Sequence, residues 1–159
     1  YPLLKLAERL KRLSDTFGVQ VYLEPGEAAI TKSTTLEVTV LDTLHNGKNL
    51  AIVDSSIEAH MLDLLIYRQS AKMEPNEGPE EWMVCGKSCL AGDIFGEFRF
   101  PHPLKAGDRL SIQDAAGYTM VKKNWFNGVK MPSIAIRELD GTLTEVRDFG
   151  YDEFAAALS

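Results

Sequence analysis

A cysteine in a loop of small residues is the feature of this sequence with the clearest capacity for chemistry. Cys89 lies in the run Cys85-Gly-Lys-Ser-Cys-Leu-Ala-Gly-Asp93, directly after a strand-like approach at 82–84. The small residues around the thiol leave room for a ligand or another backbone segment to come close. A thiol in such a turn can be a buried apolar group, a metal ligand, a nucleophile or a proton donor. These roles stay open on the loop alone.

Other stretches with glycine and polar side chains accompany the cysteine loop. Leu23-Glu-Pro-Gly-Glu27 lies upstream, whereas Asp114-Ala-Ala-Gly-Tyr118 and Phe126-Asn-Gly128 lie downstream. Glycine leaves space for a ligand and polar side chains offer hydrogen bonds, and this combination is typical of functional loops. Because the stretches are far apart in the sequence, they form one site only if the fold brings them together.

The composition indicates a folded domain with an ordinary surface. The chain has 159 residues, of which 45% are hydrophobic, 9% aromatic and 25% charged. This suits one domain, or one domain plus a fragment of another. The net charge of -6, with no basic stripe interleaved with aromatic residues, disfavours nucleic-acid binding. We therefore expect no nucleic-acid partner.

The distribution of cysteine, histidine and apolar residues predicts a cytoplasmic protein. No apolar run approaches the ~20 residues that cross a bilayer, so we expect no membrane partner. Two cysteines are too few for a disulfide scaffold, and three scattered histidines argue against a zinc site. The first residues lack an initiator Met and open directly into an amphipathic helix. We therefore expect the chain to be the C-terminal piece of a longer polypeptide.

The first thirty residues predict one helix followed by one strand. Apolar residues recur at helical spacing over 3–16, Gly18 ends the pattern, and 19–23 has the composition of a short strand. A helix–strand pair is the unit of an α/β barrel, in which function lies at the carboxyl ends of the strands. Glu24 and Glu27 occupy that position. We expect residues 1–32 to be the last helix–strand unit of a TIM-type α/β barrel.

The rest of the chain, residues 33–159, predicts a mainly β domain. Strands are expected at 34–43, 49–54, 82–84, 95–100, 109–114, 133–137 and 142–149, with a hairpin turn at Asn46-Gly47 and a terminal helix over 151–158. Residues 57–68 fit either a short helix or a loop, and 71–80 predicts a surface loop. Short strands at this spacing suggest a Greek-key-like β-barrel or a sandwich.

In order and spacing, these motifs resemble the alanine-racemase-like, fold-type III pyridoxal-phosphate decarboxylases, which include ornithine and diaminopimelate decarboxylases. Within the group they are most similar to the carboxynorspermidine (carboxyspermidine) decarboxylases. The stretches that carry the resemblance are Leu23–Ala28, Asp54–Asp63, Gly86–Asp93, Pro101–Asp108, Asn124–Gly128 and Phe149–Tyr151. The resemblance implies an α/β barrel plus a β domain, a homodimer with shared active sites and bound pyridoxal 5'-phosphate. It also implies decarboxylation of a polyamine precursor to norspermidine or spermidine.

The resemblance assigns cofactor contacts to three residues. Glu24 takes the position of the glutamate that pairs with the pyridine nitrogen and keeps it protonated, so that the ring can accept electrons. Gly26 offers a backbone N–H to the phosphate, and Tyr118 fits the tyrosine that hydrogen-bonds to it. The residues also allow a solvated Glu24, an ordinary turn at Gly26 and a half-buried strand tyrosine at Tyr118.

A different pair of residues is expected to recognise the substrate. Ornithine and diaminopimelate decarboxylases carry Arg where this chain has Glu27, and an acid repels carboxylate but attracts ammonium. We predict that Glu27 and Asp63 bind the cationic amines of the substrate, each charge-assisted pair contributing ~1.5–3 kcal/mol if shielded from water. A solvated acid is the alternative. Leu90 stands where the diaminopimelate enzyme has Glu, which argues against that substrate.

Within this resemblance, Cys89 matches the active-site cysteine that approaches the cofactor from the partner subunit. That cysteine returns a proton to the carbon that has lost its carboxylate. A free thiol, with a pKa of ~8.5, is mostly protonated at neutral pH yet can give up its proton. Cys85 has no such match and is expected in the core. Asp93 is expected either to contact the substrate or to serve the Gly92-Asp93 turn.

The required Schiff-base lysine lies before residue 1 in this family, so the chain is expected to hold only part of an active site. Two other functions stay open. The chain can belong to another decarboxylase of the fold, acting on ornithine, lysine or diaminopimelate, or to a racemase. It can also belong to a non-catalytic relative, although the presence of Glu24 and Cys89 favours an enzyme.

Overall fold

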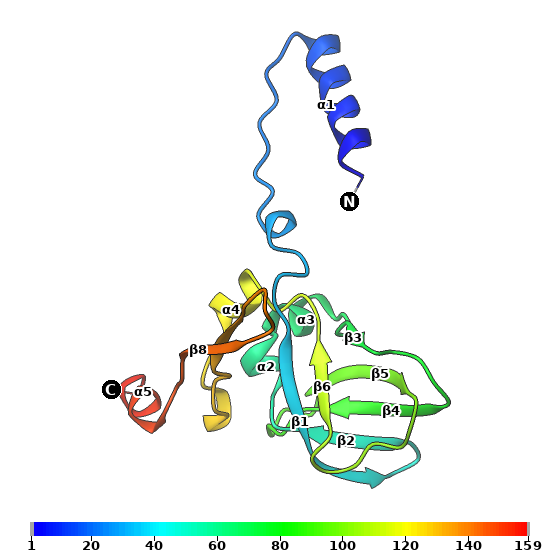
Figure 1. The fold of residues 1–159 in the computed structure, drawn as a ribbon, viewed down its shortest axis with the longest axis vertical. Helices are drawn as coiled ribbons and strands as arrows, with labels where there is room; N and C mark the ends of the chain where they lie inside the picture. The colour runs from blue at the N-terminus through cyan, green and yellow to red at the C-terminus, as the bar shows by residue number, and fades with distance from the viewer. Residues whose placement is uncertain (1, 159) are drawn as a thin grey trace.

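The computed structural model describes residues 2–158, which divide into three regions (Figure 1). We name them the N-terminal segment (2–33), the sheet domain (34–129) and the C-terminal segment (130–158). The elements are α1 (Leu3–Phe17), η1 (Glu27–Ala29), β1 (Leu36–His45), β2 (Asn49–Val53), α2 (Ile57–His60), α3 (Leu62–Tyr67), β3 (Met73–Glu74), β4 (Glu80–Cys85), β5 (Ile94–Phe100), β6 (Arg109–Ile112), α4 (Tyr118–Lys122), η2 (Phe126–Gly128), β7 (Ile134–Arg137), β8 (Leu143–Arg147) and α5 (Tyr151–Ala156).

The sheet domain is a six-stranded sheet that is nearly closed into a barrel. Its strands lie in the order β3-β6-β1-β2-β4-β5. All neighbours are antiparallel except β2 and β4, which run parallel. The Ala71 N–H, just before β3, donates to the Phe95 carbonyl of β5 at 2.7 Å, so the two ends of the sheet approach each other. The mainly β, barrel-like fold expected from the sequence is confirmed.

The core of the barrel follows from the alternation of apolar residues along the strands. In β1, Leu36, Val38 and Val40 are buried, whereas Glu37 between them is exposed. Successive side chains of a strand point to opposite faces, so this period-two pattern places one apolar face inside. The largest fully buried side chains of the described residues include Val53 of β2, Val84 of β4, Phe95 of β5 and Ile112 of β6.

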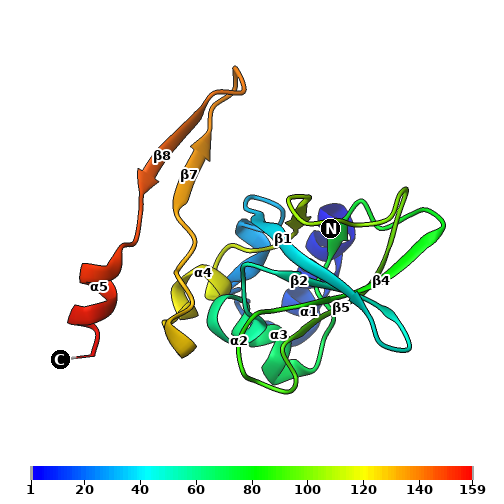
Figure 2. The ribbon, with the colours of Figure 1, turned by 90° about the horizontal axis from the view of Figure 1, so that it is seen from below.

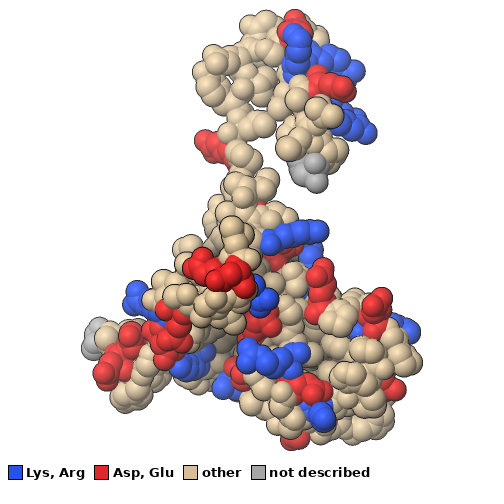
Figure 3. Space-filling model, viewed as in Figure 1, with Lys and Arg blue, Asp and Glu red and all other residues tan. Residues whose placement is uncertain are grey.

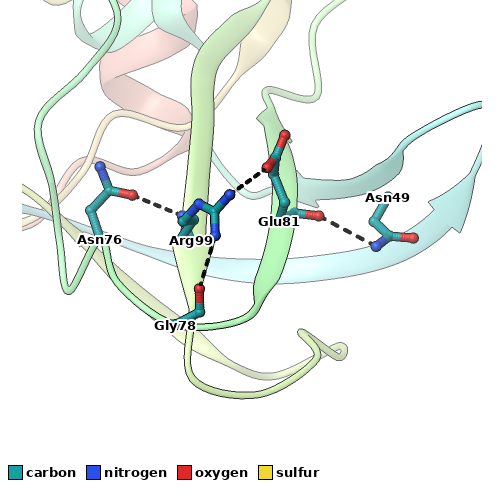
Figure 4. Close-up of polar contacts among 5 residues, drawn as sticks. All are labelled: Asn49, Asn76, Gly78, Glu81 and Arg99. Atoms are coloured by element: carbon teal, nitrogen blue, oxygen red, sulfur yellow. Dashed lines mark hydrogen bonds and ion pairs between the residues drawn. The ribbon is translucent and has the colours of Figure 1, made fainter.

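A loop crosses the end of the β4–β5 pair and caps the edge strand β5 (Figure 4). The Arg99 backbone N–H donates to Asn76 Oδ1 at 2.8 Å, and the Arg99 guanidinium reaches Glu81 at 3.3 Å and the Gly78 carbonyl at 3.5 Å. Asn49 of β2 donates its side-chain amide to the Glu81 carbonyl at 3.3 Å. Covering exposed strand N–H groups in this way prevents pairing with other chains.

Short helices cover one end of the sheet. Residues 57–68, which the sequence left between helix and loop, form α2 and α3, and Ser56 caps α2 by accepting the Ala59 N–H. The alternative in which Tyr118 is a half-buried strand residue is wrong: Tyr118 is the first residue of α4 and is exposed. The cause is Gly117, whose φ of 57° turns the chain after β6 into a helix.

The N-terminal segment extends away from the sheet domain (Figure 1). Helix α1 forms as expected and ends at Gly18, which has a left-handed φ of 63°. The strand expected at 19–23 does not form. A strand needs a neighbour to take its backbone hydrogen bonds, and no described segment pairs with these residues. None of the residues of α1 is buried.

In the C-terminal segment, β7 and β8 pair as an antiparallel hairpin that projects from the sheet domain (Figure 2). The two strands and the helix α5 lie where the sequence predicts them. Every residue of β8 is exposed. After β8, Phe149 and Phe154 pack against Trp125 of the sheet domain, with ring centroids 6.3 and 5.6 Å from that of Trp125.

Candidate active site

The Cys89 loop is braced from within by Asp93. The Asp93 side chain is buried, and its Oδ2 accepts hydrogen bonds from the N–H and the hydroxyl of Ser88, at 3.0 and 2.5 Å. Its Oδ1 accepts the N–H of Ile57, the first residue of α2, at 2.7 Å. A Cβ at Gly86 would overlap this carboxylate, which explains the glycine there. Of the two roles expected for Asp93, this geometry favours the turn role over substrate contact.

The tip of the same loop carries Cys89, whose side chain is exposed. Its backbone N–H donates to Asn127 Oδ1 at 3.1 Å. Asn127 lies in the stretch Phe126-Asn-Gly128 that the sequence marks beside the cysteine loop, but no role was predicted for its side chain. Cys85, at the end of β4, is half-buried, and burial raises the pKa of its thiol, with a smaller contribution from Asp93. Cys85 is therefore held protonated.

Two predicted site stretches meet where η1 contacts the turn before α4. A Cβ on Gly117 would lie 2.8 Å from Ile30 Cδ1 and 3.8 Å from Glu27 Cγ, so the side chains of Ile30 and Glu27 lie close to the Gly117 backbone. Asp114 fixes this arrangement: it accepts the Lys32 N–H at 2.9 Å and pairs with Lys72 at 2.5 Å. The hydrogen bond from Lys72 is the main cause that lowers the pKa of Asp114. Glu27 and Tyr118 are thereby brought to one end of the sheet domain.

A cavity of about 220 Å³ lies at this contact, and both Glu27 and Asp63 line it. The charged residues of its lining are three acids and one lysine: Glu27, Asp63, Asp114 and Lys72. Asp63 also pairs with Lys122 at 2.6 Å, and this hydrogen bond raises the pKa of Lys122. Asp114 and Asp63 are thus ion-paired with lysines, and the negative charge in excess at the lining is that of Glu27, which suits a cationic ligand.

The three predicted cofactor contacts do not line this cavity: Tyr118 is the first residue of α4, and Glu24 and Gly26 precede η1 in the chain. Tyr118 is 59% exposed, and Lys122 Nζ lies 4.8 Å from the centre of its ring. Glu24 is exposed in the extended segment before η1. The Gly26 N–H donates to the Glu24 carbonyl at 2.9 Å, so a phosphate would have to share or replace that bond. Cys89 and Glu24 line neither this cavity nor a second, larger cavity between β1, β6 and the C-terminal segment.

A larger cavity, of about 1080 Å³, lies between β1, β6 and the start of the C-terminal segment. None of the seven site residues predicted from the sequence lines it. His60, at its inner wall, is buried and hydrogen-bonds through Nδ1 to the Ser55 hydroxyl at 2.8 Å. Burial, aided by the charge of Lys87, lowers the pKa of His60 to about 4. His60 is thus neutral at physiological pH and belongs to the packing of α2.

Charge and composition of the surface add no further site. On the face shown in Figure 3, basic and acidic side chains are interspersed over the sheet domain and α1. Between residues 2 and 158, no helix is long and apolar enough to cross a bilayer. The same residues contain no group of three or more histidine, cysteine and acidic side chains placed to hold a metal ion.

Residues 28–116 match the family model of the pyridoxal-dependent decarboxylase C-terminal sheet domain. The carboxynorspermidine/carboxyspermidine decarboxylase of Herminiimonas arsenicoxydans is 60% identical over 159 residues, which are 100% of this chain and 44% of that protein. The carboxyaminopropylagmatine decarboxylase of Synechocystis sp. is 37% identical over 86% of this chain and 36% of its own length. The crystal structure of carboxynorspermidine decarboxylase complexed with norspermidine from Campylobacter jejuni superposes with a TM-score of 0.85 and 35% identity, covering 99% of this chain and 47% of that one. The chain therefore spans less than half the length of these relatives.

Proposed function

The chain belongs to the pyridoxal-dependent decarboxylases, and from this premise we propose that it is the C-terminal part of an enzyme that decarboxylates carboxynorspermidine or carboxyspermidine. The product would be norspermidine or spermidine, in the cytoplasm. The observation that carries the proposal is the acidic cavity shared by Glu27 and Asp63. Its excess of carboxylates fits the amines of a polyamine precursor, and an uncompensated carboxylate would be repelled there.

Pyridoxal phosphate is the cofactor of this family, and the residues of this chain fit its outer contacts. When bound, it supplies the electron sink that allows carbon dioxide to leave. Glu24 would hold a proton on the ring nitrogen, and Tyr118 would donate its hydroxyl to the phosphate. Gly26 has no heavy atom within 4 Å of the place where a Cβ would stand, so a phosphate can approach its backbone.

The covalent lysine is proposed to lie on the barrel portion of the protein, outside this chain. Lys72, which lines the acidic cavity, is ion-paired with Asp114, and Lys122 is ion-paired with Asp63 of the same lining. Those hydrogen bonds raise the pKa of both amines, which keeps them protonated and poor nucleophiles. Helix α1 and residues 19–23 would then complete the barrel, which would cover the apolar face that α1 exposes here.

Cys89 is proposed to act in the active site of a neighbouring protomer, as the group that returns a proton to the substrate carbon. Its exposure, and its absence from the cavity that Glu27 and Asp63 line, support a site shared across a homodimer. Mixing a Cys89→Ala protein with a Glu24→Ala protein should restore activity, because a mixed dimer contains one complete site. If each site drew both residues from one protomer, mixing would restore none.

The substrate assignment is tested with the full-length protein and a Glu27→Gln variant. We expect turnover of carboxynorspermidine or carboxyspermidine, with ornithine, lysine and diaminopimelate much poorer substrates. Removing the Glu27 charge should raise the KM for the preferred substrate about 10-fold or more, as expected for one lost charge-assisted contact. The measurement is carbon dioxide release across a range of substrate concentrations.

A matched control is Glu77→Gln, which removes an exposed acid that does not line the cavity. Its KM should equal that of the wild type. An unchanged KM in Glu27→Gln would remove the proposed amine contact. Preferred turnover of ornithine or diaminopimelate would assign the chain to another decarboxylase of the fold, and no turnover of any of these substrates would favour the non-catalytic relative.

A further inference from the structure

The loop that carries Cys89 is held at its base by Asp93, and its tip is joined to a distant segment of the chain through Asn127. At the base, the buried Asp93 accepts three hydrogen bonds, and the Gly86 N–H donates to the Asp93 carbonyl at 2.8 Å. At the tip, the Cys89 N–H donates to Asn127 Oδ1 at 3.1 Å, and Asn127 lies 38 positions further along the chain. The placement of the thiol therefore depends on where η2 holds Asn127.

Asn127 is built to present this acceptor. Its φ and ψ are 57° and 15°, in the left-handed region, which asparagine tolerates better than most residues. The turn is closed on either side, because the Gly128 N–H donates to the Trp125 carbonyl at 2.9 Å and the Phe126 N–H donates to Asn124 Oδ1 at 2.7 Å. The side chain of Asn127 is thus directed by a fixed backbone turn.

Helix α2 anchors both the base of the cysteine loop and the η2 turn. The Ile57 N–H of α2 donates to Asp93, and the Ala59 carbonyl of α2 accepts the Asn124 N–H at 2.8 Å. The cysteine loop and the η2 turn, which are far apart in the sequence, are therefore both hydrogen-bonded to α2. From the other side, Phe154 of α5 packs on Trp125 and lies 3.6 Å from the place where a Cβ on Gly128 would stand.

We propose that Asn127 is a positioning residue for Cys89, fixing the loop tip so that the thiol meets the substrate carbon. The proposal rests on the proposed function, in which Cys89 returns the proton. In that step the S–H bond breaks, a C–H bond forms with the electron pair left by carbon dioxide, and a thiolate remains on Cys89. Proton delivery to carbon is sensitive to placement of the donor, so a tip free to move by about 1 Å would deliver it less reliably.

Two substitutions separate the hydrogen bond from the backbone turn. Asn127→Gly keeps the left-handed conformation and removes the acceptor, whereas Asn127→Asp keeps both. In the full-length protein without cofactor, hydrogen exchange at the Cys89 amide should accelerate about fivefold to tenfold in Asn127→Gly, as for one lost hydrogen bond. In Asn127→Asp it should stay near the wild-type rate. Alkylation of Cys89 by iodoacetamide should change in Asn127→Gly alone, with the half-buried Cys85 as the internal reference thiol.

With cofactor and substrate, Asn127→Gly should lower kcat and raise the fraction of turnovers that end in abortive transamination, with KM unchanged. Equal amide exchange and equal Cys89 alkylation in all three proteins would overturn the positioning role. So would an Asn127→Asp variant as impaired as Asn127→Gly. If the wild type does not decarboxylate the polyamine precursors, the proposed function fails, but the exchange and alkylation rates still decide whether Asn127 holds Cys89.

Discussion

The sheet domain and the N-terminal segment contain equally regular apolar patterns, yet only the sheet domain buries its pattern within this chain. In β1, Val38 and Val40 are 0% and 1% exposed. In α1, which has an apolar residue at each turn, no residue is buried, and Phe17 is 68% exposed. Periodicity identifies the face that requires a partner, whereas burial depends on whether that partner is present.

The two regions are joined through residues 27–34. The Lys32 N–H donates to Asp114, and the Ala115 N–H donates to the Thr34 carbonyl at 3.0 Å. Gly117 allows Ile30 to approach the turn before α4. This junction also brings Glu27 to the acidic cavity. The barrel core is thus buried within this chain, α1 is not, and residues 27–34 form the short junction that places Glu27 at the candidate site.

The largest effect is expected from Phe95→Ala in the barrel core. Phe95 is 0% exposed, so truncation removes its buried surface and leaves a cavity. We expect the free energy of unfolding to fall by ~3–5 kcal/mol, measured by urea denaturation of the full-length protein. Phe17→Ala is the matched control in α1 and should cost less. A Phe17→Ala cost equal to that of Phe95→Ala would show that α1 is as deeply packed in the whole protein as the barrel core.

The next effect is a pH dependence that should come from the sheet domain. Because burial lowers the pKa of His60 to about 4, the unfolded chain binds a proton more readily than the folded chain below its ordinary pKa of ~6.5. Stability should be full above that value and fall by about 3 kcal/mol as the pH drops from there toward 4. The nearby Asp54 and Asp93 oppose the shift, and Lys87 supports it.

His60→Asn should flatten this slope, because its side chain does not titrate and can keep the Ser55 contact. The measurement is the free energy of unfolding of the full-length protein between pH 4 and pH 7. The exposed His102 provides the control, and His102→Asn should keep the wild-type slope. An identical slope in His60→Asn and the wild type would contradict the assignment.

The smallest effect tests the junction. In Gly117→Ala, the alanine backbone would keep the left-handed φ of 57°, and its Cβ would lie 2.8 Å from Ile30 Cδ1. We expect a cost of ~1–3 kcal/mol and faster hydrogen exchange in η1, while exchange in β1 and β6 stays protected. Gly92→Ala is the control, since no heavy atom lies within 4 Å of its Cβ position. Slow exchange retained in η1 would show that this junction does not depend on Gly117.

Much of the fold could be predicted because the relevant signals are local. The alternation in β1, the Asn46-Gly47 turn and the glycine after α1 each act within a few residues, and the structure has the elements they predict. The strand expected at 19–23 does not form within this chain, because its formation requires a neighbouring strand. The strand alternative for Tyr118 was wrong because one left-handed glycine redirected the chain.

The candidate site was predictable by residue type but not by arrangement. Acids, a tyrosine and a thiol could be selected because the motifs that contain them resemble those of a known family and because their side chains suit the implied chemistry. Glu27 and Asp63 were predicted to act together and they line one cavity, but that Asp93 braces its own loop and that Asn127 holds Cys89 could not be read from the chain. These contacts join positions that are distant in sequence.

The sequence by itself determined which residues could do chemistry, where most strands and helices begin and which faces are apolar, because these depend on side chains and near neighbours. Only the tertiary structure decided the parallel pairing of β2 with β4, the neutral state of His60 and the contact between Asn127 and the Cys89 loop. These depend on which distant groups meet and on how much water is excluded when they do, and neither quantity is local in the sequence.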